Sequence, residues 1–297
     1  MTVTNWWNRR QRLIAPYLFL SPFFLILLIF GVYAVLYSLQ LSFFKVEGIG
    51  GERVFVGLRN YLALLEDKRF IRSVINSSYY AAGSVFILTP LALFLAVALN
   101  SKIVPWKSFY RLAFFVPVIT SAVVVSIMFI LVFEQKFGLL NAGLKGLGIA
   151  PIPWLRHPAW AMPSIILMGI WTWTGYEALY FLGGLQNIPV ELQEAARIDG
   201  ANEIQVFQHV TIPLLRPVII FVVIQAIIGS YNLFAQPKLL TGGGPQDATL
   251  TMTMYLYFNG FSLTKLGYAS AIGYALTLII FMLSVLQIAI FGRQRND

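Results

Sequence analysis

Six apolar runs, each about 20 residues long, are the feature of this chain that most constrains its fold. A helix rises about 1.5 Å per residue, so a run of this length crosses the roughly 30 Å hydrocarbon layer of a bilayer. The fourth run contains Glu177 and the fifth ends in a polar stretch, so these two are the least uniformly apolar. The sequence predicts an all-α integral membrane protein with six transmembrane helices, at residues 17–36, 79–99, 112–133, 160–182, 214–234 and 268–291.

The overall composition supports a membrane protein and argues against other classes. Hydrophobic residues make up 58% of the 297 residues and charged residues only 11%, whereas soluble domains have about 25% charged residues. The net charge is +9, but the basic residues flank the apolar runs, which indicates membrane orientation rather than nucleic-acid binding. The first apolar stretch continues from Leu13 to about Leu39, longer than the ~7–15 residues of a signal peptide, so we expect a retained span.

The basic residues near the ends predict the orientation. Arg9, Arg10 and Arg12 precede the first run without any acid, which places the N-terminus in the cytoplasm. Six spans return the C-terminus to that side, in agreement with Arg293 and Arg295. We expect three regions: a cytoplasmic N-terminus, first transmembrane helix and first outer loop (1–74), a core of five transmembrane helices with a cytoplasmic loop at 183–213 (75–291), and a cytoplasmic tail (292–297).

The cytoplasmic loop contains a polar hairpin, EAARIDGANEIQVFQHVTIPLLRP, at residues 194–217. Pro189 suits the first turn of a helix, Gly200 suits its end, and Asn202 can cap a second short helix that ends before Pro213. Two physical interpretations remain open: a rigid knob that docks into another protein, and an amphipathic hairpin that lies against lipid headgroups. On the first helix, Leu192, Ala195, Ala196 and Asp199 share one side, and Glu191, Glu194 and Ile198 share another.

The order of residues in this hairpin resembles the EAA loop of ABC importer permeases: EAA, DGA after two residues, then Phe207 and IPLLRP. The resemblance extends over most of the chain from about Tyr17. It is greatest to the first of the two permease subunits in maltose, multiple-sugar and glycerol-phosphate importers. Four further stretches resemble these carbohydrate-type permeases: FVGLRNYLALLEDKRFIRSVINS (55–77), FGLLNAGLKGLG (137–148), LGGLQNIPVELQEAA (182–196) and LLTGGGPQDAT (239–249).

The resemblance implies a type I ABC importer permease fold and a role in ATP-driven, binding-protein-dependent uptake of oligosaccharides or related carbohydrates. It implies the cytoplasmic (inner) membrane of a bacterium or archaeon. The implied partners are a second homologous permease subunit, a cytoplasmic ABC ATPase dimer, an extracytoplasmic solute-binding protein, the carbohydrate substrate and membrane lipid, with no nucleic acid. In the family the EAA loop seats in a cleft of the ATPase, which carries over here to Glu191, Glu194, Ala195, Ala196, Asp199, Gly200, Ala201, Phe207 and Pro213.

We expect no enzyme activity and no cofactor in this chain, so that ATP and Mg are used by the partner ATPase. A Walker A loop needs a glycine-rich turn followed by a lysine that reaches the phosphates. The glycine cluster at 242–244 is followed by Pro245, lacks that lysine and is expected on the outer side. The chain has no cysteine, and its two histidines, His157 and His209, lack the spacing of a metal site.

Polar groups inside apolar spans are costly, so they are candidates for a substrate pathway. In the family, substrate contacts come from the middle of the spans that flank the EAA loop, which implicates Trp173, Tyr176, Ser230, Tyr231 and Asn232. Glu177 is a further candidate because it is the only acid well inside a span. Aromatic faces stack on sugar rings, and amides or hydroxyls pair with sugar hydroxyls. Tryptophan and tyrosine are also common in interfacial belts, which is the structural alternative. Glu177 is expected either to contact substrate or to pair with a basic residue of the second permease.

Two other classes of function fit the sequence less well than an ABC permease. A secondary transporter driven by an ion gradient would need buried acids along its pathway, and the spans offer only Glu177. An integral membrane enzyme would need paired histidines, paired carboxylates or a nucleophile beside a base, and the spans contain no such set.

Overall fold

The computed structural model describes residues 3–46, 48, 50–101 and 104–292. Throughout these residues the chain is mainly helical, with a single two-stranded sheet. The predicted tail beyond residue 292, with Arg293 and Arg295, lies outside the described residues. The chain divides into two compact units, Met1–Ala63 with Phe258–Tyr274 and Leu64–Tyr257 with Ala275–Asp297.

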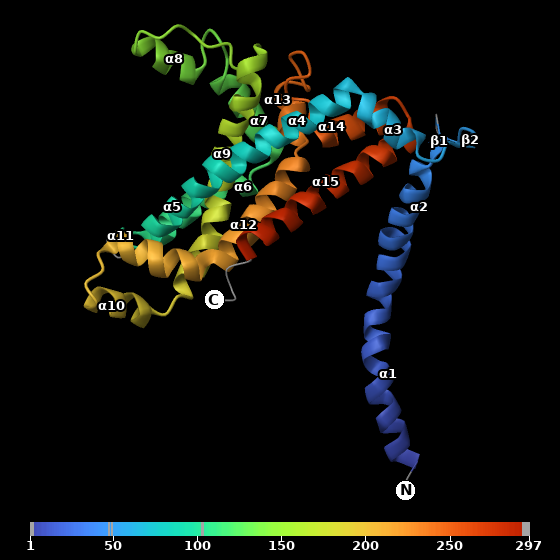
Figure 1. Ribbon diagram of the computed structural model, residues 1–297, viewed down its shortest axis with the longest axis horizontal. Coiled ribbons are helices and arrows are strands. Elements are labelled where there is room, and N and C mark those ends of the chain that lie inside the picture. Colours follow the sequence, from blue (N-terminus) through green and yellow to red (C-terminus); the bar gives the residue numbers. More distant parts are fainter. Residues whose placement is uncertain (1–2, 47, 49, 102–103, 293–297) are drawn as a thin grey trace. The chain divides into compact units, whose positions relative to one another are not determined.

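The first unit begins with one long helical segment, formed by α1 (Val3–Ile26), the π-helical turn η1 (Leu27–Val32) and α2 (Tyr33–Ser42) (Figure 1). Its apolar part, Leu13–Ser42, has 30 residues, and none of its most apolar stretch is buried within the chain. A helix that is apolar on all sides needs an apolar solvent, which a bilayer provides. This segment contains the first predicted span, 17–36.

Two short strands follow this segment. Strand β1 (Phe44–Val46) pairs antiparallel with β2 (Arg53–Phe55), and Phe44 lies opposite Phe55. The amide of Asn60, at the start of α3 (Arg59–Glu66), donates to the carbonyl oxygens of Ser42 at 2.8 Å and Phe44 at 3.1 Å. The unit also contains η4 (Phe258–Ser262) and the first part of α15 (Leu266–Gly292).

The second unit is built around one central helix, α9 (Pro158–Gln186), which packs against α5, α6 and α12. Figure 1 shows these helices running side by side, with α10 and α11 joining α9 to α12 at one end. The other helices of the unit are α4 (Lys68–Gly83), η2 (Ser84–Leu88), α5 (Thr89–Asn100), α6 (Lys107–Ile119), α7 (Ala122–Val132), α8 (Leu139–Gly146), α10 (Val190–Ile198), α11 (Glu203–Val206), η3 (Phe207–Thr211), α12 (Ile212–Tyr231), α13 (Ala235–Leu240) and α14 (Met252–Tyr257).

Small side chains allow α5 to approach α9 closely. Ala92 and Ala96 on α5 are fully buried, and they share one apolar cluster with Ala178 and Phe181 of α9. In a membrane, close backbone approach replaces the hydrophobic effect as the source of helix association. This packing fixes the part of α9 that precedes the polar hairpin.

The third predicted span is wrong as a single straight helix. The structure breaks it into α6 and α7, whose axes differ by 97°. Thr120 and Ser121 lie between the two helices with extended backbones, and Pro117 lies within the last turn of α6. The missing N–H of Pro117 weakens that turn, and the Thr120 hydroxyl donates to the carbonyl of Val116 at 2.9 Å. Such local bonds compete with the helical ladder, so the span bends there.

The six predicted spans are mainly helical, but they differ in how apolar they are. Four described segments are long and apolar enough to cross a bilayer: Leu13–Ser42, Lys68–Asn100, Glu203–Leu240 and Leu266–Ile290. The bent pair of α6 and α7 adds a fifth if it is one span. Helix α9 has 29 residues, which is long enough, but its tryptophan, threonine, tyrosine and glutamate residues reduce its apolar character.

Candidate functional site

The polar hairpin forms the helix–glycine–helix structure that its sequence predicts. Helix α10 begins after Pro189 and ends at Ile198, with Asp199 as its C-cap. Gly200 has a φ of +88°, in the left-handed region that favours glycine. The Asn202 side chain accepts from the N–H of Gln205 at 2.9 Å, and the Gln205 side chain accepts from the N–H of Asn202 at 2.8 Å. This capping box starts α11.

The predicted end of the second helix before Pro213 is wrong. Helix α11 continues through the π-helical turn η3 into α12, and Pro213 lies in the first turn of α12. A π turn shifts the backbone hydrogen bonds by one residue. Proline has no backbone N–H to donate, and a residue in the first turn of a helix does not need one. The hairpin is therefore joined to α12 without a loop.

An ion pair braces the two helices of the hairpin. The Arg197 guanidinium donates from Nε to Oε1 of Glu203 at 2.7 Å and from Nη2 to Oε2 at 3.1 Å. This bond raises the pKa of Arg197 above its ordinary value, so the guanidinium stays charged. Both side chains are exposed, so solvent and salt screen the pair, and its main effect is to hold the two helices in one relative orientation.

Most side chains of the hairpin are exposed at the surface of the chain. Helix α10, which is described in full, contains no buried residue. Apolar side chains are part of this exposed surface: Leu192 is 46%, Ile198 86% and Ile204 68% exposed. Of the predicted coupling residues, Ala196, Ala201 and Phe207 are half-buried, and the exposed ones are Glu191, Glu194, Ala195, Asp199, Gly200 and Pro213.

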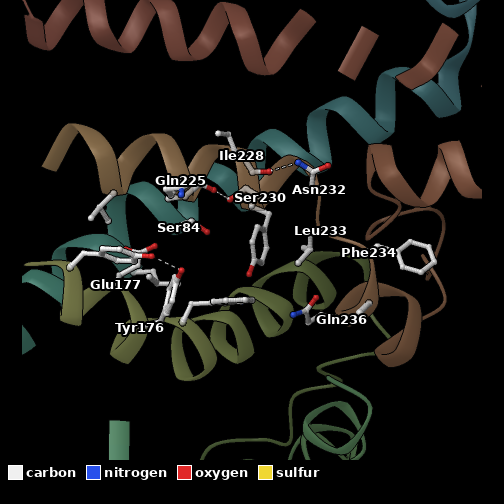
Figure 2. A pocket seen from close by; sticks show the side chains of 18 residues that line it. Ser84, Tyr176, Glu177, Gln225, Ile228, Ser230, Asn232, Leu233, Phe234 and Gln236 are labelled. Carbon is white, nitrogen blue, oxygen red and sulfur yellow. Dashed lines mark hydrogen bonds between the residues drawn. The ribbon is translucent and has the colours of Figure 1, made fainter. Parts of the chain in front are cut away.

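A cavity of about 510 Å³ lies between α9, α12 and the α4–η2 segment. Figure 2 shows Tyr176 and Glu177 on α9 facing the cavity across from Gln225 and Ser230 on α12. Leu233, Phe234 and Gln236, from the segment after α12, line its other end. The two helices that flank the hairpin in the sequence therefore both line the cavity.

The structure brings five of the six predicted pathway residues to this cavity: Trp173, Tyr176, Glu177, Ser230 and Asn232. Tyr231 is not among the lining residues. It is 3% exposed, and its hydroxyl hydrogen-bonds that of Ser78 at 2.7 Å. Its helical phase turns it toward α4, so it joins two helices of the unit instead of lining the cavity.

The aromatic residues of α9 form a stepped row along the cavity. Trp173 and Tyr176 have ring centroids 6.0 Å apart, and Tyr176 and Tyr180 have centroids 5.1 Å apart, both edge to face. The hydroxyls of Tyr176 and Tyr180 hydrogen-bond at 2.6 Å. This row offers flat apolar faces together with hydroxyl groups, which suits a ligand with both C–H and O–H surfaces.

Glu177 is the one acid in the cavity lining, all of which the structure describes, and it is 8% exposed. Its Oε2 accepts a hydrogen bond from the hydroxyl of Thr89, at the start of α5, at 2.9 Å. A buried carboxylate needs hydrogen-bond partners, and no sequence pattern indicates that a threonine of the second predicted span supplies one.

Five polar lining residues lie outside the predicted pathway set: Tyr80, Ser84, Tyr180, Gln225 and Gln236. Tyr180 lies one turn after Tyr176, so helical spacing could have found it. Tyr80 and Ser84 come from the second span, and only the packing of α4 against α9 and α12 brings them to the cavity. No group of three or more metal-ligating side chains occurs among the described residues.

Comparisons with known proteins show which family this chain resembles. The family model described as "Binding-protein-dependent transport system inner membrane component" matches residues 88–295. The arabinooligosaccharides transport system permease protein AraP of Bacillus subtilis is 38% identical, over 95% of this chain and 90% of its own. The lactose transport system permease protein LacF of Rhizobium radiobacter is 36% identical, over 91% of this chain and 92% of its own.

A solved structure shares the fold. In the crystal structure of a bacterial ABC transporter involved in the import of the acidic polysaccharide alginate, one chain superposes on this one with a TM-score of 0.84. The match covers 98% of this chain and 100% of that chain, at 21% sequence identity.

Proposed function

Because the chain belongs to the family of binding-protein-dependent transport system inner membrane components, we propose that it forms half of the translocation pathway of an ATP-driven carbohydrate importer. The chain is the permease component, and ATP hydrolysis belongs to a separate subunit. The relatives' names include arabinooligosaccharides and lactose as transported compounds. The aromatic row and the hydroxyl and amide groups of the cavity support a substrate of that chemical class.

The observation that carries the proposal is the direct connection between hairpin and cavity. The hairpin lies between α9 and α12, and both of these helices line the cavity. Since α11 runs into α12 through η3 without a loop, a force on the hairpin is transmitted along a helix rather than absorbed by a flexible segment. A rigid hairpin that is moved from outside would therefore change the shape of the cavity.

We assign the hairpin to contact with a cytoplasmic ABC ATPase dimer that binds ATP and Mg. Glu194 and Glu191 are exposed and can meet basic residues of that protein, while exposed Leu192 and Ile198 can enter an apolar part of its groove. The small residues Ala195, Ala196 and Ala201 permit close approach. Phe207 and Pro213 belong to the junction that joins the hairpin to α12.

This assignment implies an arrangement in the cytoplasmic membrane of a bacterium or archaeon. Six spans would place both termini and the hairpin in the cytoplasm. A second, homologous permease would complete the pathway, and a solute-binding protein would deliver substrate from outside. The apolar, exposed surface of Leu13–Ser42 fits contact with lipid or with that second permease.

Nucleotide-driven uptake in vesicles that contain the complete complex tests the proposal. We expect Gly200→Asp and Glu194→Lys to abolish uptake while the chain still inserts, because the first strains the turn and the second reverses a docking charge. Glu52→Lys makes the same charge change in an exposed residue between β1 and β2 and should preserve uptake.

The same vesicles separate the importer from the rival class. Uptake that continues without nucleotide and depends on an ion gradient would support a secondary transporter with Glu177 as its ion-linked acid. Uptake unchanged by Gly200→Asp and Glu194→Lys would remove the coupling role of the hairpin.

A further inference from the structure

The described residues that line the cavity include an acidic side chain and no basic side chain. Eighteen residues line it, all of them described, and they include one acid, Glu177, and no lysine, arginine or histidine. The other polar lining groups are neutral: the hydroxyls of Tyr80, Ser84, Tyr176, Tyr180 and Ser230, and the amides of Gln225, Asn232 and Gln236. All of these can hydrogen-bond to the hydroxyl groups of a sugar.

The surroundings of Glu177 do not offset its charge. The hydrogen bond that the structure gives to its carboxylate comes from the neutral hydroxyl of Thr89, at 2.9 Å. Figure 2 shows Glu177 next to Tyr176, with Ser84 and Gln225 on the facing helices. An anion in this space would lose its hydration without gaining a cationic partner, which is costly. It would also meet a carboxylate behind poorly screening apolar walls.

We propose that this half of the pathway admits uncharged carbohydrates and repels anionic ones, and that Glu177 determines this selectivity. The proposal rests on the function proposed above and adds the charge class of the substrate. It distinguishes this chain from the alginate importer that shares its fold, whose substrate is an acidic polysaccharide. Glycerol phosphates and uronic acid oligosaccharides are excluded in the same way as other anions.

The charge of the cavity can be measured without knowing the substrate. The chain contains no cysteine, so one introduced thiol reports on one place in this subunit. Gly229 on α12 lines the cavity, and a Cβ at that position meets nothing within 4 Å, so Gly229→Cys adds a thiol without a clash. The complex, with any cysteines of its partner subunits replaced, is placed in nanodiscs so that reagents reach it from both sides.

Two methanethiosulfonate reagents of similar size, one with a trimethylammonium group and one with a sulfonate, then modify this thiol. Each rate is divided by that reagent's rate with a small free thiol. We expect the cationic reagent to be favoured about tenfold, since a cleft of one sign of charge concentrates its counter-ions. Adding Glu177→Gln should bring the two normalised rates to within about twofold of each other.

A matched variant separates the carboxylate from its hydrogen bond. Thr89→Val removes the hydroxyl but retains the charge of Glu177, so the preference for the cationic reagent should persist. Equal rates for the two reagents in the Gly229→Cys chain, or a preference that Glu177→Gln leaves unchanged, would overturn the proposal.

Uptake of a neutral and an anionic trisaccharide, maltotriose and trigalacturonate, distinguishes this proposal from the proposed function. Nucleotide-driven uptake of the anionic sugar would refute the charge selectivity and leave the importer intact. A cationic preference that depends on Glu177, in a complex without nucleotide-driven uptake of any sugar, would refute the importer and leave the charge selectivity of the cavity standing.

Discussion

Gly175 on α9 lies directly against the backbone of Phe114 on α6: a Cβ built on Gly175 would come within 1.8 Å of the Phe114 carbonyl oxygen. The contact is with backbone, so a side-chain rotation cannot relieve it. Gly175 precedes Tyr176 and Glu177, which line the cavity. The crossing of α6 over α9 is therefore fixed beside the polar part of the pathway.

We expect Gly175→Ala to push α6 away from α9 and to lower the free energy of unfolding by about 1–3 kcal/mol. Thermal unfolding in detergent, followed by gel filtration of the remaining folded protein, measures the change. Gly183→Ala is the matched control, because it lies on the same helix and its Cβ meets nothing within 4 Å. Equal melting temperatures for the two variants would contradict the close contact.

The hairpin could be predicted from the sequence because its signals are local. Pro189, Gly200 and the pair Asn202 and Gln205 act within one or two helical turns, so the order of residues alone specifies the start of α10, its end and the start of α11. Its junction with α12 could not be predicted in the same way, since a π turn that accommodates Pro213 leaves no distinctive residue pattern.

The bend in the third span and the full cavity lining depend on tertiary structure. Residues 112–133 are apolar except for Thr120, Ser121 and Ser126, and hydropathy reports neither the 97° bend nor its direction. Sequence position placed Tyr231 beside Ser230 and Asn232, but helical phase turns it toward Ser78. Tyr80 and Ser84 line the cavity only because α4 packs beside α12, which no periodicity within α4 reports.

The side chain of Asn141 on α8 makes four hydrogen bonds within the segment between α7 and α9. Its Nδ2 donates to the carbonyls of Gln135 at 3.0 Å and Ile152 at 2.9 Å. Its Oδ1 accepts from the N–H of Ile152 at 3.0 Å and from Nε1 of Trp154 at 3.0 Å. The side chain is 3% exposed, so all four bonds are made away from water.

We expect Asn141→Asp to destabilise this loop by about 2–4 kcal/mol, because a carboxylate cannot donate to the two carbonyls and is buried without a cation. Limited proteolysis at Lys145 and the fluorescence of Trp154 measure the loosening. Lys145→Gln, which changes an exposed charge on the same helix, should leave the fluorescence unchanged. A native-like loop in Asn141→Asp would show that these bonds do not support it.

Arg69 and Asp247 form a bidentate ion pair within the second unit, with both N–O distances at 2.9 Å. Asp247 has a φ of +56°, and its carbonyl also accepts from the Asn76 amide at 2.7 Å.

We expect a double-mutant cycle with Arg69→Gln and Asp247→Asn to give a coupling free energy of about 0.5–1 kcal/mol, since both side chains are partly exposed. Asparagine tolerates the left-handed backbone, so Asp247→Asn removes the charge without adding strain. Thermal unfolding at low and high salt measures the coupling, and strict additivity at low salt would rule the interaction out.

Glu134, just after α7, is expected to make the turn at 134–137 dependent on pH. Its carboxylate accepts from the backbone N–H groups of Phe137 and Lys136, each at 2.6 Å. The bond from Phe137, followed by that from Lys136, holds the pKa of Glu134 below its ordinary value. A carboxyl group whose folded pKa is depressed contributes stability above its unfolded pKa, and this contribution disappears as the pH falls through the folded value.

We therefore expect the turn at 134–137 to be ordered at neutral pH and to loosen only when the pH falls below the ordinary range for a glutamate. Hydrogen exchange of the Lys136 and Phe137 amides, corrected for the intrinsic pH dependence of exchange, measures this opening. Glu134→Gln keeps an acceptor oxygen but removes the titration, so its turn should open to the same extent from pH 7 to pH 3. A wild-type chain whose protection at these two amides did not change with pH would contradict the role of the carboxylate, and a Glu134→Gln chain with the wild-type pH profile would assign the effect to another group.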